Sequence, residues 1–285
     1  TRNDAYMLYG TSSADWELRK FHAGAGAIPY TLQKMDQTFF LDDRGITSIF
    51  TVQYFGDFQS AVASDKIDPY IQSKKDNATD SIKVRAKNQY RLYFDDKTGV
   101  EMTFINKKNQ GLMPFTLSHQ INCTVSAEDA NGFEVLYGGF DDGYVRRLDS
   151  GTSFDGETVD SFIRTTYYHY NSPGMRKRFR ELSLEINADT STTLTVTPSY
   201  DFGGTYTPKT SPVSSSYSVT VAADQWSEAD ISNSSTGITV VASERVRING
   251  IGTNMGFIIS NSSIYDKPIT LQGGIVEFSN RGVRR

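Results

Sequence analysis

Residues 89–104 read QYRLYFDDKTGVEMTF, and this stretch decides the fold class. Two runs rich in aromatic and aliphatic residues flank an Asp-Asp pair and a glycine. Aspartate side chains accept hydrogen bonds from nearby backbone N–H groups in turns, and glycine adopts a positive φ without steric cost. The stretch therefore predicts a β-hairpin, in which a tight turn joins two antiparallel strands.

The same arrangement occurs twice more in the first half of the chain. Residues 38–49 read TFFLDDRGITSI, and residues 134–148 read EVLYGGFDDGYVRRL. The Asp-Asp pairs recur at intervals of about 50 residues, and repeats of about 40–50 residues built from short strands are typical of propeller blades. Residues 1–150 are therefore predicted to form β-propeller-like blades. About three such units fit there, whereas propellers usually have about four to eight blades, so either some blades lack the Asp-Asp marker or the missing blades lie outside this chain.

Short alternating strands continue in the second half of the chain. Residues 179–186, for example, read FRELSLEI and place Leu182, Leu184 and Ile186 on one face of a strand. Several strands of this kind, separated by turns, predict an antiparallel β-sandwich-like domain over residues 151–285 that completes or decorates the blades. The expected fold class is all-β.

One helix is expected, within residues 58–73, which read FQSAVASDKIDPYIQS. The Ser-Ala-Val-Ala run that begins at Ser60 can start a short helix. Pro69 is expected to end or kink it, because proline lacks the backbone N–H that a helix interior needs. A Thr, Ser and Pro-rich stretch at residues 206–216 is expected to be a long exposed loop.

Composition and charge exclude several classes of protein. The 285 residues include 29 Lys and Arg and 33 Asp and Glu, a net charge of −4 that excludes a generally basic nucleic-acid-binding protein but not a local basic patch. Mean hydropathy is −0.43 and no apolar run approaches about 18 residues, so no membrane insertion is expected. The first residue is Thr1, which suggests a chain cut from something longer. The one cysteine, Cys123, permits no internal disulfide and is expected to be a buried structural thiol.

The sequence predicts no catalytic residue, metal site or cofactor. The Asp-Asp pairs could ligate calcium, but they lack the spaced Asp-x-Asp-x-Asp-Gly pattern, so turns are the better interpretation. His22, His119 and His169 fall in no zinc motif. The glycine-rich residues 24–27 and 250–256 open no predicted helix and are expected to serve strand packing or turns. A glycosidase would need two carboxyl groups about 5–10 Å apart, a distance that sequence does not give.

The densest basic run consists of Arg176, Lys177, Arg178 and Arg180. One interpretation is a solvated strand edge, where positive charge discourages pairing with other strands. The other is an interface with an acidic partner or a contact with DNA in a channel. The same two interpretations hold for Arg146, Arg147, Arg281, Arg284 and Arg285.

Five stretches, taken together and in order, carry a resemblance to a known family. They are AGAGAI at 23–28, FLDDRGI at 40–46, KNQYRLYF at 87–94, FDG at 154–156 and RKRFR at 176–180. This set resembles the tail hub or nozzle proteins of short-tailed bacteriophages, some of which are described as packaged-DNA stabilisation proteins. The resemblance covers most of residues 10–187, and the remainder is similar only in being rich in β-strands.

The resemblance implies a structural virion protein of the phage tail, without catalysis. Such proteins look like β-propellers with added β domains, and they assemble as a homo-oligomeric ring, typically of six copies, below the portal and its adaptor. The ring closes the DNA channel after packaging and guides the double-stranded genome out during ejection, and tail fibres or spikes attach around it. Family members usually have more sequence before the first matched stretch.

Two other functions stay open. The first is a carbohydrate-binding or glycan-cleaving β protein of a virion, in which Trp16 and Trp226 could stack on sugar rings. The second is another structural part of a phage tail, such as a tail-tube or baseplate protein.

Overall fold

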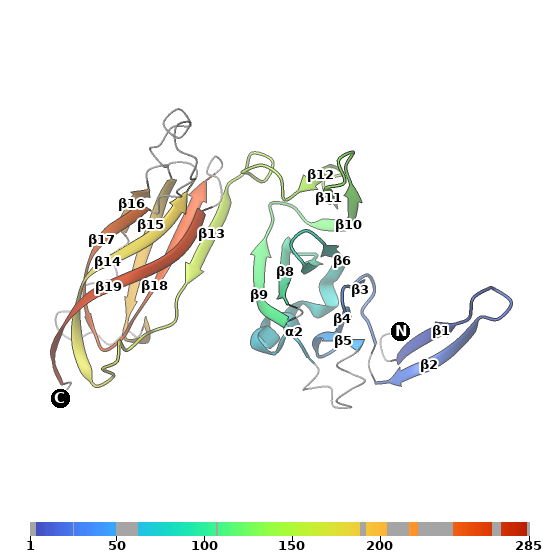
Figure 1. Ribbon diagram of the computed structural model, residues 1–285, viewed down its shortest axis with the longest axis horizontal. Coiled ribbons are helices and arrows are strands. Elements are labelled where there is room, and N and C mark those ends of the chain that lie inside the picture. The colour runs from blue at the N-terminus through green and yellow to red at the C-terminus, as the bar shows by residue number, and fades with distance from the viewer. Residues whose placement is uncertain are drawn as a thin grey trace, which may run out of the picture. The chain divides into compact units, whose positions relative to one another are not determined.

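The computed structural model describes residues 4–24, 26–49, 62–106, 108–188, 192–203, 217–221, 242–263 and 269–283. Most of these residues lie in antiparallel β-strands, which form several small sheets, none of them closed (Figure 1). The prediction of an all-β chain is confirmed. The chain divides into two compact units, Thr1–Ser150 and Gly151–Arg285, which we call the first and second units.

Each strand of the first unit pairs with its neighbour in sequence. The strands are β1 (Asp4–Tyr9), β2 (Glu17–Ala23), β3 (Gln33–Lys34), β4 (Thr38–Asp42), β5 (Gly45–Ser48), β6 (Ala78–Val84), β7 (Gln89–Phe94), β8 (Thr98–Ile105), β9 (Lys108–Thr116), β10 (Ile121–Glu128), β11 (Glu134–Phe140) and β12 (Val145–Leu148). They form the sheets β1-β2, β3-β4-β5, β6-β7-β8-β9 and β10-β11-β12. The three predicted hairpins are β4–β5, β7–β8 and β11–β12, and all three are confirmed.

Local hydrogen bonds explain why the Asp-Asp pairs mark these turns. In the first hairpin, Asp42 Oδ1 accepts the backbone N–H groups of Arg44 and Gly45, at 2.7 and 2.9 Å. In the other two hairpins the second aspartate, Asp96 or Asp142, accepts the N–H two residues later, at 3.2 and 3.1 Å. Because these bonds join residues two or three apart, sequence was sufficient to predict them.

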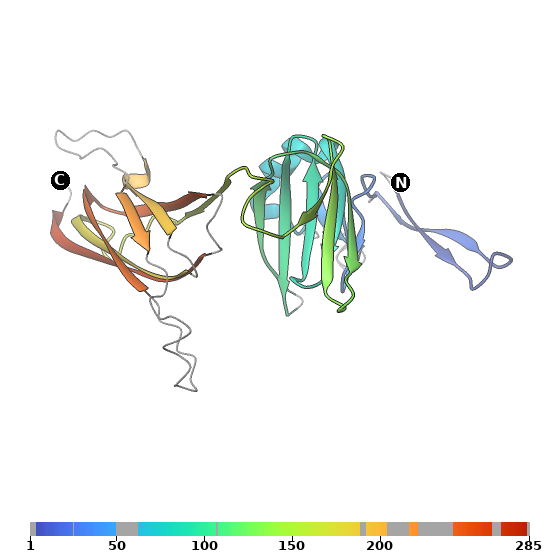
Figure 2. The ribbon, with the colours of Figure 1, turned by 90° about the horizontal axis from the view of Figure 1, so that it is seen from above.

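Strand β7 lies in the middle layer of the first unit, and all six of its residues are buried. Tyr90, Leu92 and Phe94 point to one face and share a core with residues of β4, β5 and β8. Tyr93 points to the other face and shares a second core with residues of β6, β10 and β11. The sheet β6-β7-β8-β9 is therefore covered on one face by β3-β4-β5 and on the other by β10-β11-β12 (Figure 2).

Helix α2 of the first unit begins near the residue where the sequence predicted that a helix would end. Helix α2 spans Asp68–Lys74, between the 3₁₀ turns η1 (Asp65–Ile67) and η2 (Lys75–Asn77). Pro69 lies in the first turn of α2, where a helix leaves N–H groups unpaired and the fixed φ of proline already fits. The prediction that Pro69 ends or kinks a helix is therefore wrong. Residues 50–61, where the helix was expected to start, lie outside the described part of the chain.

The second unit contains two antiparallel sheets. The strands are β13 (Val159–Arg164), β14 (Met175–Ala188), β15 (Thr192–Tyr200), β16 (Tyr217–Val221), β17 (Ala242–Gly252), β18 (Met255–Ser263) and β19 (Ile269–Val283), with a 3₁₀ turn η3 (Asp201–Gly203) after β15. They form the sheets β13-β18-β15-β16 and β17-β14-β19. One hydrophobic core draws side chains from both sheets.

The alternation predicted for β14 is confirmed. Leu182, Leu184 and Ile186 all point into the core and are at most 1% exposed. Gly250 on β17 serves close packing, as its stretch was expected to do, since an added Cβ would lie 1.9 Å from Cζ of Tyr200. The stretch at 206–216, predicted to be a loop, lies outside the described residues.

Cys123 is exposed, so the prediction of a buried thiol is wrong. A β-bulge in β10 is the reason: Ile121 pairs with Phe140 and Cys123 pairs with Gly139, so one extra residue lies between them. The bulge reverses the alternation, and Thr124 instead faces the neighbouring sheet. No feature of the sequence indicated the bulge.

Candidate functional site

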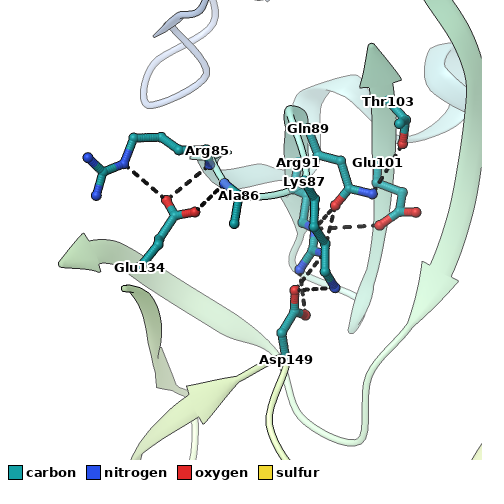
Figure 3. A network of polar contacts seen from close by, with 9 residues as sticks. All are labelled: Arg85, Ala86, Lys87, Gln89, Arg91, Glu101, Thr103, Glu134 and Asp149. Atoms are coloured by element: carbon teal, nitrogen blue, oxygen red, sulfur yellow. Dashed lines mark hydrogen bonds and ion pairs between the residues drawn. The ribbon is translucent and has the colours of Figure 1, made fainter. Parts of the chain in front are cut away.

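Two clusters of charged side chains stand out, one in each unit. The first lies between the sheets β6-β7-β8-β9 and β10-β11-β12, and we call it the inter-sheet network (Figure 3). Its members are Arg85, Ala86, Lys87, Gln89, Arg91, Glu101, Thr103, Glu134 and Asp149.

Arg91 is the centre of the inter-sheet network. It lies on β7 and is 7% exposed. Its Nη1 and Nη2 donate to the two carboxylate oxygens of Asp149, at 2.7 and 2.8 Å, in the bidentate geometry that gives the strongest ion pairs. Nε and Nη2 also donate to Oε1 of Gln89, at 3.1 and 2.8 Å, and Oε2 of Glu101 lies 3.5 Å from Nε. The buried guanidinium is thus surrounded by acceptors.

Asp149 receives a second cation, because Lys87 Nζ donates to its Oδ2 at 2.8 Å. Burial alone would raise the pKa of the Asp149 carboxyl. The hydrogen bonds from Arg91 and Lys87 outweigh burial, and the pKa is lowered from its ordinary value. Asp149 follows β12, so this ion pair joins the end of the first unit to its middle sheet.

Glu134 makes a second link between the same two sheets. Its carboxylate accepts the backbone N–H groups of Arg85 and Ala86, at 3.0 and 2.7 Å, and the hydroxyl of Ser126 at 2.6 Å. These bonds outweigh the effect of burial, which by itself would raise the pKa, and they lower the pKa of Glu134. The turn between β6 and β7 is thereby fixed to β11.

The contacts of the inter-sheet network hold the two sheets together. Ion-pair networks with a structural role also shift pKa values, and here each charged side chain contacts another group of the same chain. Within the described ranges, no group of three or more His, Cys, Asp or Glu side chains is placed to hold a metal ion. The Asp-Asp pairs likewise bind their own chain: Asp96 pairs with Lys74, and Asp142 pairs with Arg146 at 2.7 Å.

The second cluster contains the predicted basic run, which lies on β14. Lys177 is fully buried, and its Nζ donates to the backbone carbonyls of Ser172, Thr253 and Met175, at 2.5, 3.0 and 3.2 Å. Burial lowers the pKa of Lys177. Because its ammonium already holds two turns of the second unit, any contact of this run with a partner must come from Arg176, Arg178 and Arg180.

These three arginines lie on or beside the outer face of the sheet β17-β14-β19, which is the face away from the core. Arg176 and Arg178 alternate with the inward Lys177 and Phe179. Arg180 occupies a β-bulge and is exposed.

Strand pairing adds two arginines that sequence reasoning missed. On β17, Arg247 pairs with Glu181 and Arg245 pairs with Ser183, and both arginines are exposed on the same outer face. We call the resulting surface the arginine band: Arg176, Arg178, Arg180, Arg245 and Arg247. The alternation of Arg245 and Arg247 with the apolar Val246 was visible in the sequence. The choice of β14 as the partner strand was not.

Of the other arginines and tryptophans singled out from sequence, four lie among the described residues. Arg146 stacks on Phe140, with 5.0 Å from its Cζ to the ring centroid, and Arg147 is exposed on β12. Arg281 is exposed on β19, where it lies between Asn280 and Gly282, the partners of Lys177 and Arg176 on β14. Trp16, at the start of β2, is 58% exposed. Trp226, Arg284 and Arg285 lie outside the described residues.

No protein-family model matches the chain, and no curated protein matches it. In the described part of the chain, no helix is both long and apolar enough to cross a membrane.

Proposed function

We propose that this chain is a structural protein of a bacteriophage tail, a hub or nozzle built as a ring of identical copies, with six as the expected number. In this role it closes the DNA channel, contacts the portal or adaptor, guides the genome out and provides attachment for tail fibres or spikes. It works in the virion as a mechanical part, without catalysis or a cofactor.

The observation that carries the proposal is the stack of three sheets built around the Asp-Asp hairpins. Each sheet is too small to bury both of its faces alone, and the middle sheet β6-β7-β8-β9 has neighbours on both. Face-to-face stacking of successive antiparallel sheets is how propeller blades share their cores. The inter-sheet network links two of these sheets through charge-assisted hydrogen bonds, which suits a rigid scaffold.

Exposed apolar side chains on the outer face of β10-β11-β12 favour a stack of sheets that continues beyond this third sheet. Val125, Tyr137 and Val145 lie on this face and are 55%, 39% and 72% exposed. A propeller blade leaves such apolar side chains for the next blade to cover. In the second unit, two antiparallel sheets around one core support the sandwich-like domain.

Native mass spectrometry and imaging of phage particles test the proposal. The chain has a mass of 31.8 kDa, so a six-membered ring has a mass of about 190 kDa. We expect a closed ring of this size and one such ring per tail. A stable monomer that is absent from particles would refute the proposal, and many stacked rings per tail would favour a tube protein instead.

A carbohydrate-binding role has one observation in its favour. Tyr9 and Trp16 flank the loop between β1 and β2, and they are 45% and 58% exposed. Exposed aromatic rings suit stacking on sugars. A glycan array with the Trp16→Ala variant discriminates: saturable glycan binding that this variant abolishes would favour the carbohydrate role.

A further inference from the structure

The arginine band forms a continuous line across two strands. Arg176, Arg178 and Arg180 follow one another along β14, and the line continues on β17, where Arg245 lies opposite Ser183. At about 3.3 Å per residue, the line from the level of residue 176 to that of residue 183 is about 23 Å long, and neighbouring strands are about 4.8 Å apart. Side chains of one sign are therefore spaced closely along a narrow strip.

Among the described residues, little of the positive charge of the arginine band is balanced by ion pairs. Its one ion pair among the described residues joins Arg245 Nε to Glu181 Oε1 at 3.7 Å, and the Arg245 side chain is 73% exposed. Register places two further carboxylates on the same face, those of Glu185 and Glu277, so that five guanidinium groups face three carboxylates. Like charges held this close repel one another, and an external anion would relieve that repulsion.

The remaining residues of this face indicate the kind of anion. No aromatic side chain lies on the outer face within the described parts of β14, β17 and β19, and its apolar members are Ile251 and Ile275. The residues that dominate the affinity of protein interfaces are enriched in Trp and Tyr as well as Arg, and single-stranded nucleic acids bind by stacking bases on aromatic rings. A face that offers guanidinium groups without aromatic rings fits an array of phosphates.

We propose that the arginine band binds the phosphate backbone of double-stranded DNA without reading its sequence. Duplex DNA carries one negative charge per about 1.7 Å of axis, so a 23-Å length presents about 13 phosphates, of which about half can face one surface. Arginine suits this contact because its planar fork donates two parallel hydrogen bonds to a phosphate. The inference deepens the proposed function, which would bring DNA to this face.

The inference predicts how strongly the affinity for DNA falls as the salt concentration rises. Each neutralised phosphate contributes about 0.9 to the slope of log affinity against log salt, so five contacts predict a slope of about −4.5. Affinity would then fall about 500-fold between 50 and 200 mM salt. Binding of this kind holds DNA at low salt and lets it slide.

The test is fluorescence anisotropy of the full-length chain with a labelled 30-base-pair duplex of random sequence, from 50 to 200 mM KCl. We expect the double variant Arg178→Gln, Arg247→Gln to reduce the slope of log affinity against log salt by about 1.8. The same variant should bind the duplex about 60-fold more weakly at 0.1 M salt. The control, Arg164→Gln, removes one positive charge from exposed β13 in the other sheet of the unit and should bind like the wild type. Circular dichroism melting curves check that each variant is folded.

Three results would overturn the inference. They are absence of duplex binding at 50 mM KCl, a salt slope that the double variant leaves unchanged, and competition by polyglutamate as effective as competition by DNA, which would indicate an acidic protein partner. Its failure is separable from that of the proposed function. A chain that forms the tail ring but binds DNA equally well without the two arginines refutes the inference alone, and a DNA-binding chain absent from particles refutes the proposed function alone.

Discussion

Replacing Asp149 with Asn removes the charged partner of a buried arginine and is expected to destabilise the first unit. The Arg91 side chain is 9% exposed and the Asp149 side chain 27%, so the pair lies between an exposed ion pair and a fully buried one. Exposed pairs contribute less than about 1 kcal/mol, whereas breaking a fully buried pair costs about 3–5 kcal/mol. We therefore expect Asp149→Asn to cost about 2 kcal/mol, or about 4–8 °C in Tm for a unit of this size.

Thermal and urea unfolding followed by circular dichroism measure this cost in the full-length chain. Hydrogen exchange read by mass spectrometry locates it: protection should fall in β7 and β11 and stay unchanged in β14. The matched control is Lys87→Gln, which removes the second cation on Asp149. The Lys87 side chain is 53% exposed, so its loss should cost less than about 0.5 kcal/mol. Equal losses for the two variants would refute the argument that burial makes the Arg91 pair strong.

The stability difference between the wild type and Asp149→Asn should depend on pH in a direction that follows from the pKa of Asp149. The pKa of Asp149 is lowered in the folded chain, so the folded state favours the ionised carboxyl. The stabilisation that the ionised Asp149 contributes is therefore fully present above the ordinary pKa of an aspartate, near 4. It is lost as the pH falls through the lowered pKa of the folded chain. The stability difference between the wild type and Asp149→Asn should be constant from pH 7 to 5 and shrink below pH 4. A difference that grows on acidification would contradict this assignment.

Three further experiments test the packing within each of the two units. Glu134→Gln should cost about 1–2 kcal/mol in urea unfolding because it removes the charge from the hydrogen bonds that this carboxylate accepts, whereas exposed Glu128→Gln should cost much less. Gly250→Ala should lower Tm through a cost of about 1–3 kcal/mol, since the new methyl group overlaps a tyrosine ring, whereas Gly111→Ala meets nothing within 4 Å and should be close to neutral. Cys123 should react with a maleimide in the native state nearly as fast as in urea, and strong native protection would contradict its exposure.

Features that depend on interactions between residues close together in sequence could be predicted, and features that depend on residues far apart could not. The hairpins were predictable because Asp42 and its counterparts bond to N–H groups two or three residues away. The inward face of β14 was predictable because alternation repeats every two residues. Pro69 shows the limit of such signals: proline both starts and ends helices, and only the neighbouring turns decide which.

The tertiary structure decided what depends on residues far apart in the chain. Arg91 and Asp149 are 58 positions apart, and neither has a local pattern that names the other as its partner. Arg245 and Arg247 join the run on β14 only because β17 pairs with it in one register. The bulge that exposes Cys123 has the same kind of origin, in the fit of β10 against β11. Turn chemistry and alternation are properties of a few consecutive residues, whereas register, bulges and charge clusters arise only when separate strands pack together.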